Sequence, residues 1–202
     1  WLATDPDGNT WRLDGVAKGA VLVAYDAAPT PAATSCQDPL LNNIAPGNLY
    51  TSPNLGSMGQ SYTNNGAKIY NFSWGTTNNV YDGFALDIVE FLVDKQDAMV
   101  FTSAGNAGQD ADNDTIPDLG SIGSPGTSKN ALIIGANNAV NDLGAGGQEE
   151  GRAAFSSVGP AGSYTDLSDG RVAPQLVAPG NELGGGDMGL ASEYSCRSND
   201  NN

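Results

Sequence analysis

The sequence contains no histidine among its 202 residues. Imidazole is the commonest general base of hydrolytic enzymes, so any mechanism that needs one is excluded for this chain alone. Basic residues are also few, with 8 against 23 acidic ones, and the formal net charge is −15. Because phosphate backbones bind basic surfaces, this charge balance argues against nucleic acid as a partner. It fits a secreted, a salt-adapted or a cation-binding protein.

Long apolar runs are missing as well. No stretch approaches the roughly 20 apolar residues of a membrane-spanning helix, so we expect no membrane partner. The chain opens at Trp1 without an initiator Met or a signal peptide, and we therefore expect a mature or excised piece. Two cysteines, Cys36 and Cys196, are too few for a disulfide scaffold. They either form one disulfide in an oxidising compartment or are two unrelated thiols.

What is present is the pattern of a globular α/β protein. Hydrophobic residues make up 39% of the chain and glycine contributes 27 residues, which indicates a packed core and many turns. Short apolar runs predict strands and longer periodic runs predict helices. Expected strands are 20–26, 67–74, 98–104, 131–136 and, at a sheet edge because of Pro174, 172–178; expected helices are 55–65, ending before Gly66, and 80–96.

This alternation predicts a parallel sheet built from βαβ units. Ligands of such sheets bind beyond the carboxyl ends of the strands. Here those ends are polar or rich in glycine: Ser73-Trp74-Gly75 follows one strand, and Ser103-Ala104-Gly105-Asn106 follows the next. The sequence therefore places a candidate site at this edge.

Five blocks in order resemble the subtilisin-like serine proteases, the subtilases. They are 15–26 (GVAKGAVLVAYD), 66–75 (GAKIYNFSWG), 101–108 (FTSAGNAG), 124–136 (SPGTSKNALIIGA), and 155–160 (FSSVGP) with 169–180 (DGRVAPQLVAPG). The resemblance covers about residues 15–185, and its spacing is most similar to the KP-43-type alkaline subtilases. It implies a three-layer α/β fold with a parallel sheet, incomplete at both ends.

The same comparison shows what is missing. The family's aspartate and histidine motifs would precede this segment, and its Gly-Thr-Ser-Met serine motif, absent here, would follow it. We therefore expect residues 1–196 to be a partial subtilase domain and 197–202 a polar tail. The resemblance implies a secreted serine endopeptidase acting on peptide or protein substrates. This chain alone should be inactive, and complementary fragments of the same protease would be its partners.

Asn106 is the candidate catalytic residue. The resemblance implies that its side-chain amide stabilises the oxyanion of the tetrahedral intermediate in amide hydrolysis. Glycines at 105 and 108 would let the backbone turn sharply and expose that amide. The alternative is an ordinary asparagine in a turn.

The candidate substrate-binding residues surround it. Backbone groups of Ser73, Trp74 and Gly75 would pair with an extended peptide as an added strand. Ala104 and Gly105 would form the opposite wall of a specificity pocket, with Gly123 at its base. Such small residues favour a roomy apolar pocket. Core packing is the alternative role of Trp74.

The resemblance also implies that the peptide bond between Ser124 and Pro125 is cis. The alternative is an ordinary trans turn.

An acidic loop follows directly. Asp110, Asp112, Asp114 and Asp118 stand at relative positions 1, 3, 5 and 9, and such carboxylates can wrap a calcium ion. The carbonyl of Ile116 would add a ligand, and the cofactor would be structural calcium. Position 6 is not glycine and no glutamate stands at position 12, so a solvated acidic loop is the alternative.

Three functions therefore remain open. One is a segment of a secreted endopeptidase that carries its substrate strands and oxyanion asparagine. Another is a catalytically inactive scaffold that binds peptides or calcium. The third is a purely structural acidic domain that calcium stiffens within an assembly. Flanking histidine and serine motifs in the protein as it occurs naturally would discriminate between them.

Overall fold

The computed structural model describes residues 2–4, 10–12, 17, 19–23, 48–108, 118–138, 151–162 and 171–181. The chain divides into two units, which we describe separately. Unit 1 comprises Trp1–Gly47 and Gly184–Asn202, and unit 2 comprises Asn48–Leu183. In unit 1, β1 (Leu2–Thr4) pairs antiparallel with β2 (Thr10–Arg12).

One expected strand is wrong in the part that is described. Ala20–Val23 belong to no strand, and the side chains of Val21 and Leu22 are 92% and 89% exposed. Hydrophobicity alone suggested a buried strand at 20–26. A strand also needs a neighbour to bond its backbone, and none of the described strands pairs with these residues.

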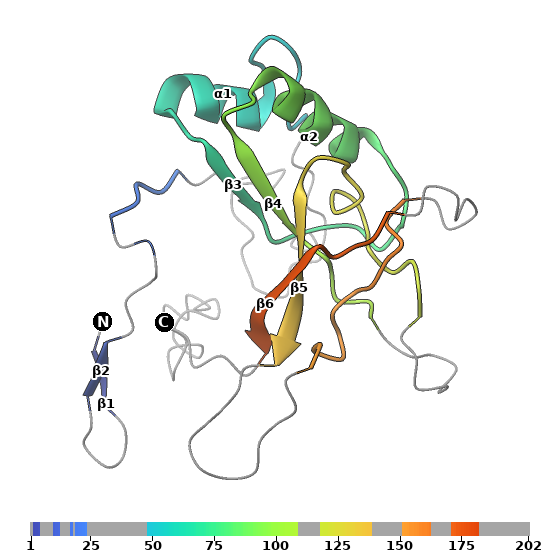
Figure 1. The fold of residues 1–202 in the computed structure, drawn as a ribbon. Helices are drawn as coiled ribbons and strands as arrows, with labels where there is room; N and C mark the ends of the chain where they lie inside the picture. Colours follow the sequence, from blue (N-terminus) through green and yellow to red (C-terminus); the bar gives the residue numbers. More distant parts are fainter. Residues whose placement is uncertain are drawn as a thin grey trace, which may run out of the picture. The chain divides into compact units, whose positions relative to one another are not determined.

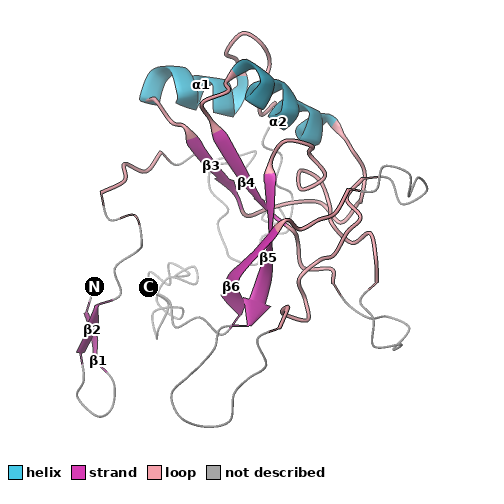
Figure 2. Ribbon diagram, in the orientation of Figure 1, coloured by secondary structure: helices cyan, strands magenta, loops and turns pink. Residues whose placement is uncertain are grey.

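Unit 2 contains a four-stranded parallel sheet in the order β3-β4-β5-β6 (Figures 1 and 2). The strands are β3 (Ile69–Phe72), β4 (Met99–Ser103), β5 (Leu132–Asn138) and β6 (Leu176–Asn181). Each overlaps a strand expected from the sequence. β6 is an edge strand that begins just after Pro174, which cannot donate to a strand ladder. The predicted α/β class is confirmed.

Two helices accompany the sheet, α1 (Gly56–Asn65) and α2 (Gly83–Asp94). Gly66 ends α1 with φ 69°, a left-handed conformation that glycine adopts without strain. Asp82 begins α2: its carboxylate accepts hydrogen bonds from the N–H groups of Phe84 and Ala85 at 3.1 and 3.2 Å. Figure 1 shows both helices near the starts of β3 and β4. None of the described helices is long and apolar enough to span a membrane.

The main core lies between these helices and β3–β4. Phe91 of α2 is at its centre, because its ring makes edge contacts with Tyr50, Tyr62 and Tyr70 at centroid distances of 5.3, 6.0 and 5.0 Å. Val100 of β4 packs in the same cluster. This packing fixes the helices on one face of the sheet.

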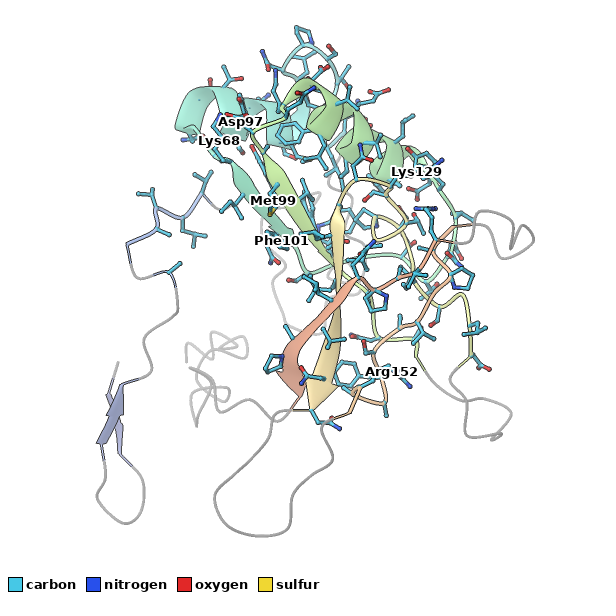
Figure 3. All side chains as sticks on the ribbon, in the orientation of Figure 1. Lys68, Asp97, Met99, Phe101, Lys129 and Arg152 are labelled. Atoms are coloured by element: carbon cyan, nitrogen blue, oxygen red, sulfur yellow. The ribbon has the colours of Figure 1, made fainter. Side chains whose placement is uncertain are left out.

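The opposite face of the sheet, here called the open face, is only partly covered. The strand register places Ile69 beside Met99, and Asn71 beside Phe101. Ile69 is 72% exposed and Met99 47% exposed, whereas Tyr70 and Val100, pointing the other way, are buried. Figure 3 labels Met99 and Phe101 along β4. Parallel sheets are normally covered on both faces, and among the described residues no helix covers the open face.

Candidate active site

A cavity of about 320 Å³ lies along the open face towards the carboxyl ends of the strands. Its lining comes from all four strands and the loops after them: Asn71, Ser73, Phe101–Asn106, Ile134–Ala136, Phe155 and Ala178–Gly180. No charged side chain is among these lining residues. The cavity can offer hydrogen bonds and apolar contacts, but within the described part of the chain it holds no general base.

Asn106 lies at the rim of this cavity. It follows β4 in the Asn106 loop (residues 104–108), where Gly105 has φ 106°. A side chain at Gly105 would be strained by this backbone conformation, and its Cβ would lie 3.0 Å from the Ser157 hydroxyl. Asn106 itself is exposed, and its side chain makes no hydrogen bond to the described residues. Its amide is therefore accessible from the cavity.

The backbone of the Asn106 loop is held by a distant segment. The Ala107 N–H donates to Ser157 Oγ at 3.0 Å, and the Ser157 N–H donates to the Gly105 carbonyl at 3.1 Å. The Gly108 N–H donates to the Phe155 carbonyl at 2.9 Å. Three bonds thus tie the loop to residues 155–157, a connection that sequence reasoning missed. The only signal was the Phe155-Ser-Ser-Val-Gly-Pro160 block.

The backbone of residues 73–75 is available for pairing. Outside the strand ladders, no backbone hydrogen bond joins Ser73, Trp74 or Gly75 to another described residue. The Ser73 hydroxyl accepts a bond from the Asn71 side-chain amide at 2.9 Å. The Trp74 ring packs edge-on against Phe72 and Phe84 at 5.9 and 5.5 Å. Its side chain therefore serves the core, which leaves only its backbone for a ligand.

Gly75 and Gly123 lie where two loops meet. The Thr76 N–H donates to the Ser124 carbonyl at 2.7 Å, and a Cβ on Gly123 would overlap the Thr76 carbonyl oxygen. A Cβ on Gly75 would lie 3.0 Å from the Ser124 carbonyl oxygen. Neither glycine is among the residues that line the cavity. The structure thus brings Ser73, Ala104, Gly105 and Asn106 together there, and sets Trp74, Gly75 and Gly123 outside it.

The Ser124–Pro125 bond is cis, as the resemblance implied. The Ser124 hydroxyl also donates to the Asp82 carboxylate at the start of α2. The Thr127 hydroxyl donates to the Val80 carbonyl at 2.7 Å. The loop after Gly123 is therefore anchored to the segment between β3 and α2.

The expected calcium ligands fall almost entirely outside the described residues. Asp110, Asp112, Asp114 and Ile116 are not described, and Asp118 is described and exposed. Within the described ranges, no three Asp, Glu, His or Cys side chains group together as metal ligands. Cys36 and Cys196 also lie outside the description, so their pairing stays a prediction.

Comparison with known families gives one match. The sequence profile of the Subtilase family, Peptidase_S8, matches residues 2–202. The chain belongs to the subtilase family. A search of curated proteins gives no match to this subtilase.

Among solved structures, this subtilase is similar to one titled "Structure of Prenylagaramide maturation protease PagA". The two share 21% sequence identity with a TM-score of 0.37, over 60% of this chain and 34% of the other. This subtilase thus spans about a third of the length of that protease chain.

Proposed function

We propose that this subtilase supplies the oxyanion donor and the substrate-binding strand of a secreted serine endopeptidase. The serine, histidine and aspartate of its triad would come from outside these 202 residues. The observation that carries the proposal is the exposed Asn106 amide at the rim of an uncharged cavity, next to a strand end whose backbone is unpaired. The spacing of the five sequence blocks supports placing this subtilase among the KP-43-type alkaline enzymes.

The chemistry follows from these two features. In this reaction class a serine attacks the peptide carbonyl, a histidine takes its proton, and the carbonyl oxygen becomes an anion. The Asn106 amide would donate to that oxygen more strongly in the transition state than in the substrate, which lowers the barrier. With no histidine in the sequence and no charged group in the cavity, this chain alone would be inert.

A peptide substrate would bind as an added strand. The free N–H and C=O groups of Ser73–Gly75 would bond its backbone, as in other cases of strand addition. Ala104 and Gly105, which line the cavity, would face one substrate side chain. These small residues favour a large apolar side chain.

The open face supports a complementary segment as partner. Ile69, Met99 and Leu176 are 72%, 47% and 55% exposed, and strand register places them on the same face as Phe101 and Ile134. A serine-bearing helix that covered this face would bury their apolar surface and complete the layers of the sheet. The same helix would bring its serine to the cavity beside Asn106.

Calcium and secretion are part of the proposal. The carboxylates at 110, 112, 114 and 118, with the Ile116 carbonyl, form a sequence pattern suited to one calcium ion. A bound ion there would stiffen the chain directly after the Asn106 loop. The net charge of −15 fits a soluble extracellular protein.

Active-site labelling tests the function. A fluorophosphonate probe should leave the chain alone unlabelled and should label the serine segment in a mixture of the chain with segments that carry the family's histidine and serine motifs. Intact mass identifies which polypeptide carries the label. Labelling of the isolated chain would contradict the proposal, because it would require a base that the sequence does not have.

The second candidate is an inactive scaffold that binds peptides or calcium. The uncharged lining of the cavity favours it, because such a site binds without chemistry. Failure of every mixture to label, with titration calorimetry showing peptide or calcium heat from the chain alone, would establish this function instead.

A further inference from the structure

The guanidinium group of Arg152 faces a ring of backbone carbonyl oxygens. Its Nη1 donates to the carbonyls of Gly108 at 3.2 Å, Ala153 at 3.2 Å and Ala154 at 3.1 Å. The Ser156 carbonyl is a fourth acceptor. Figure 3 labels this side chain. Three of these acceptors belong to the turn that follows Arg152, and only the Gly108 oxygen comes from another part of the chain.

Such a ring needs a cation. Carbonyl oxygens that converge carry partial negative charges of the same sign and repel one another. The positively charged guanidinium offsets this repulsion, and the two N–H groups of its Nη1 are shared among the four oxygens. Arg152 therefore holds its own turn in shape and joins that turn to Gly108.

Gly108 ends the Asn106 loop. The Ala104 N–H at the start of the loop donates to the Ile134 carbonyl in β5 at 2.9 Å, and the other bonds that hold the loop come from the residues just after Arg152. Ser157 and Phe155 supply the partners of Gly105, Ala107 and Gly108. The fit is tight, because a Cβ on Gly108 would overlap the Ser156 carbonyl oxygen and approach Arg152 Nη1 at 2.6 Å.

The turn that follows Arg152 is itself fixed to the sheet. The Ala153 N–H donates to the Ala136 carbonyl at 2.9 Å, and the Ala136 N–H donates to Ser156 Oγ at 2.9 Å. A continuous set of bonds thus runs from β5 through the Arg152 turn to the Asn106 loop.

We propose that Arg152 is a positioning residue for Asn106. It does not touch substrate. It holds the carbonyl oxygens of Ala153, Ala154 and Ser156 to that of Gly108, and this fixes the loop that presents the Asn106 amide. That the loop position matters for catalysis rests on the function proposed above. That Arg152 holds the loop in place does not depend on it.

Amide hydrogen exchange on the full chain tests the positioning. In Arg152→Gln, the N–H groups of Ala107 and Gly108 should exchange on the order of tenfold faster than in the wild type, because a charged hydrogen-bond donor is lost. The N–H groups of Val100 and Ile133 in the sheet should keep their rates. Arg152→Lys, which retains the charge, should restore part of the protection.

Arg171→Gln is the matched control. Arg171 also donates from Nη1 to a backbone carbonyl, that of Thr127 at 2.8 Å, which lies outside the Asn106 loop. It should leave the exchange of Ala107 and Gly108 unchanged. If Arg152→Gln does not fold, Arg152→Lys decides alone: selectively faster exchange at Ala107 and Gly108 supports the proposal. Unchanged exchange, or an equal loss at sheet and loop, overturns it.

We call the chain mixed with segments that carry the family's histidine and serine motifs the reconstituted protease. Its turnover separates the positioning role of Arg152 from the oxyanion role of Asn106. If Asn106 stabilises the oxyanion, Arg152→Gln should lower kcat and leave KM near its wild-type value. Selective loop exchange with an unchanged kcat would uphold the positioning and refute the oxyanion role of Asn106. A wild-type mixture without activity would refute the proposed function, and the exchange result on the chain would still decide the role of Arg152.

Discussion

The hydroxyl of Ser157 accepts a hydrogen bond from the backbone N–H of Ala107, 50 residues earlier in the chain, at 3.0 Å. Ser157 is completely buried, and its own N–H binds the Gly105 carbonyl, so one residue holds both sides of Asn106. The shape of the candidate oxyanion loop therefore depends on a residue far away in sequence.

Replacing Ser157 with alanine should destabilise the chain. The Ala107 N–H would lose its partner, and a typical intramolecular hydrogen bond contributes about 0.5–1.5 kcal/mol to stability. Urea denaturation would measure the loss in free energy of unfolding. Ser128→Ala is the matched control, because Ser128 is equally buried but its hydroxyl has no partner among the described residues, so its removal should be neutral.

Asn106→Leu should abolish most turnover of the reconstituted protease without loss of stability. The expected fall in kcat is about 100- to 1,000-fold, a size found for the corresponding donor in a subtilisin rather than obtained from this structure. The melting temperature should stay constant because the Asn106 side chain is exposed and unbonded among the described residues. Equal kcat for the two proteins would remove Asn106 from the mechanism.

Met99→Lys should prevent complementary segments from docking on the open face. A charged group in a newly buried apolar layer has a large desolvation cost. The fold itself should tolerate the change, since Met99 is 47% exposed. Fluorophosphonate labelling of the mixture would report the loss, with Leu86→Lys, at an exposed position of α2, as the control that should still label.

Calcium should raise the melting temperature in a concentration-dependent way. A ligand that binds only the folded state adds about 2.7 kcal/mol at 100 times its Kd. Asp112→Asn should weaken the effect, whereas Glu90→Gln, the same charge change at an exposed residue of α2, should not. Calorimetry without calcium heat, together with an unchanged melting temperature, would show the acidic loop to be only solvated.

Two buried tyrosines should make the fold sensitive to alkali. Burial and the hydrogen bond to the Asp94 carboxylate raise the pKa of Tyr50 to about 12, and burial raises the pKa of Tyr70 to about 12. Because the folded-state pKa lies above the unfolded value of 10.0, this stability is complete below pH 10 and is lost as the pH rises towards 12.

Ultraviolet absorbance of ionised tyrosine would follow this transition. Tyr50→Phe removes the bond from the Tyr50 hydroxyl to Asp94 Oδ2, which is 2.6 Å long, and should make the free energy of unfolding less dependent on pH above 10. Titration of both tyrosines near pH 10 in the folded chain would contradict the prediction.

Strong local patterns explain why most of unit 2 could be predicted. The apolar runs before Ser73 and Asn106 became β3 and β4, and the helical spacing around Ile88 became α2. The run at Ala20–Val23 shows the limit of this reasoning, because an apolar segment becomes a strand only where another strand bonds its backbone.

Residue types and their spacing were enough to predict the family, the order of strands and helices in unit 2, the lack of an imidazole base and the place of Asn106 after a strand. These are properties of residue types and of their spacing along the chain. Only the tertiary structure decided that the Trp74 ring packs in the core, that Gly123 lies against Thr76, and that Ser157 and Arg152 hold the Asn106 loop. Apart from the Trp74–Phe84 contact, these join residues separated by 44 to 50 positions in the sequence, and such contacts depend on how the sheet brings distant loops together.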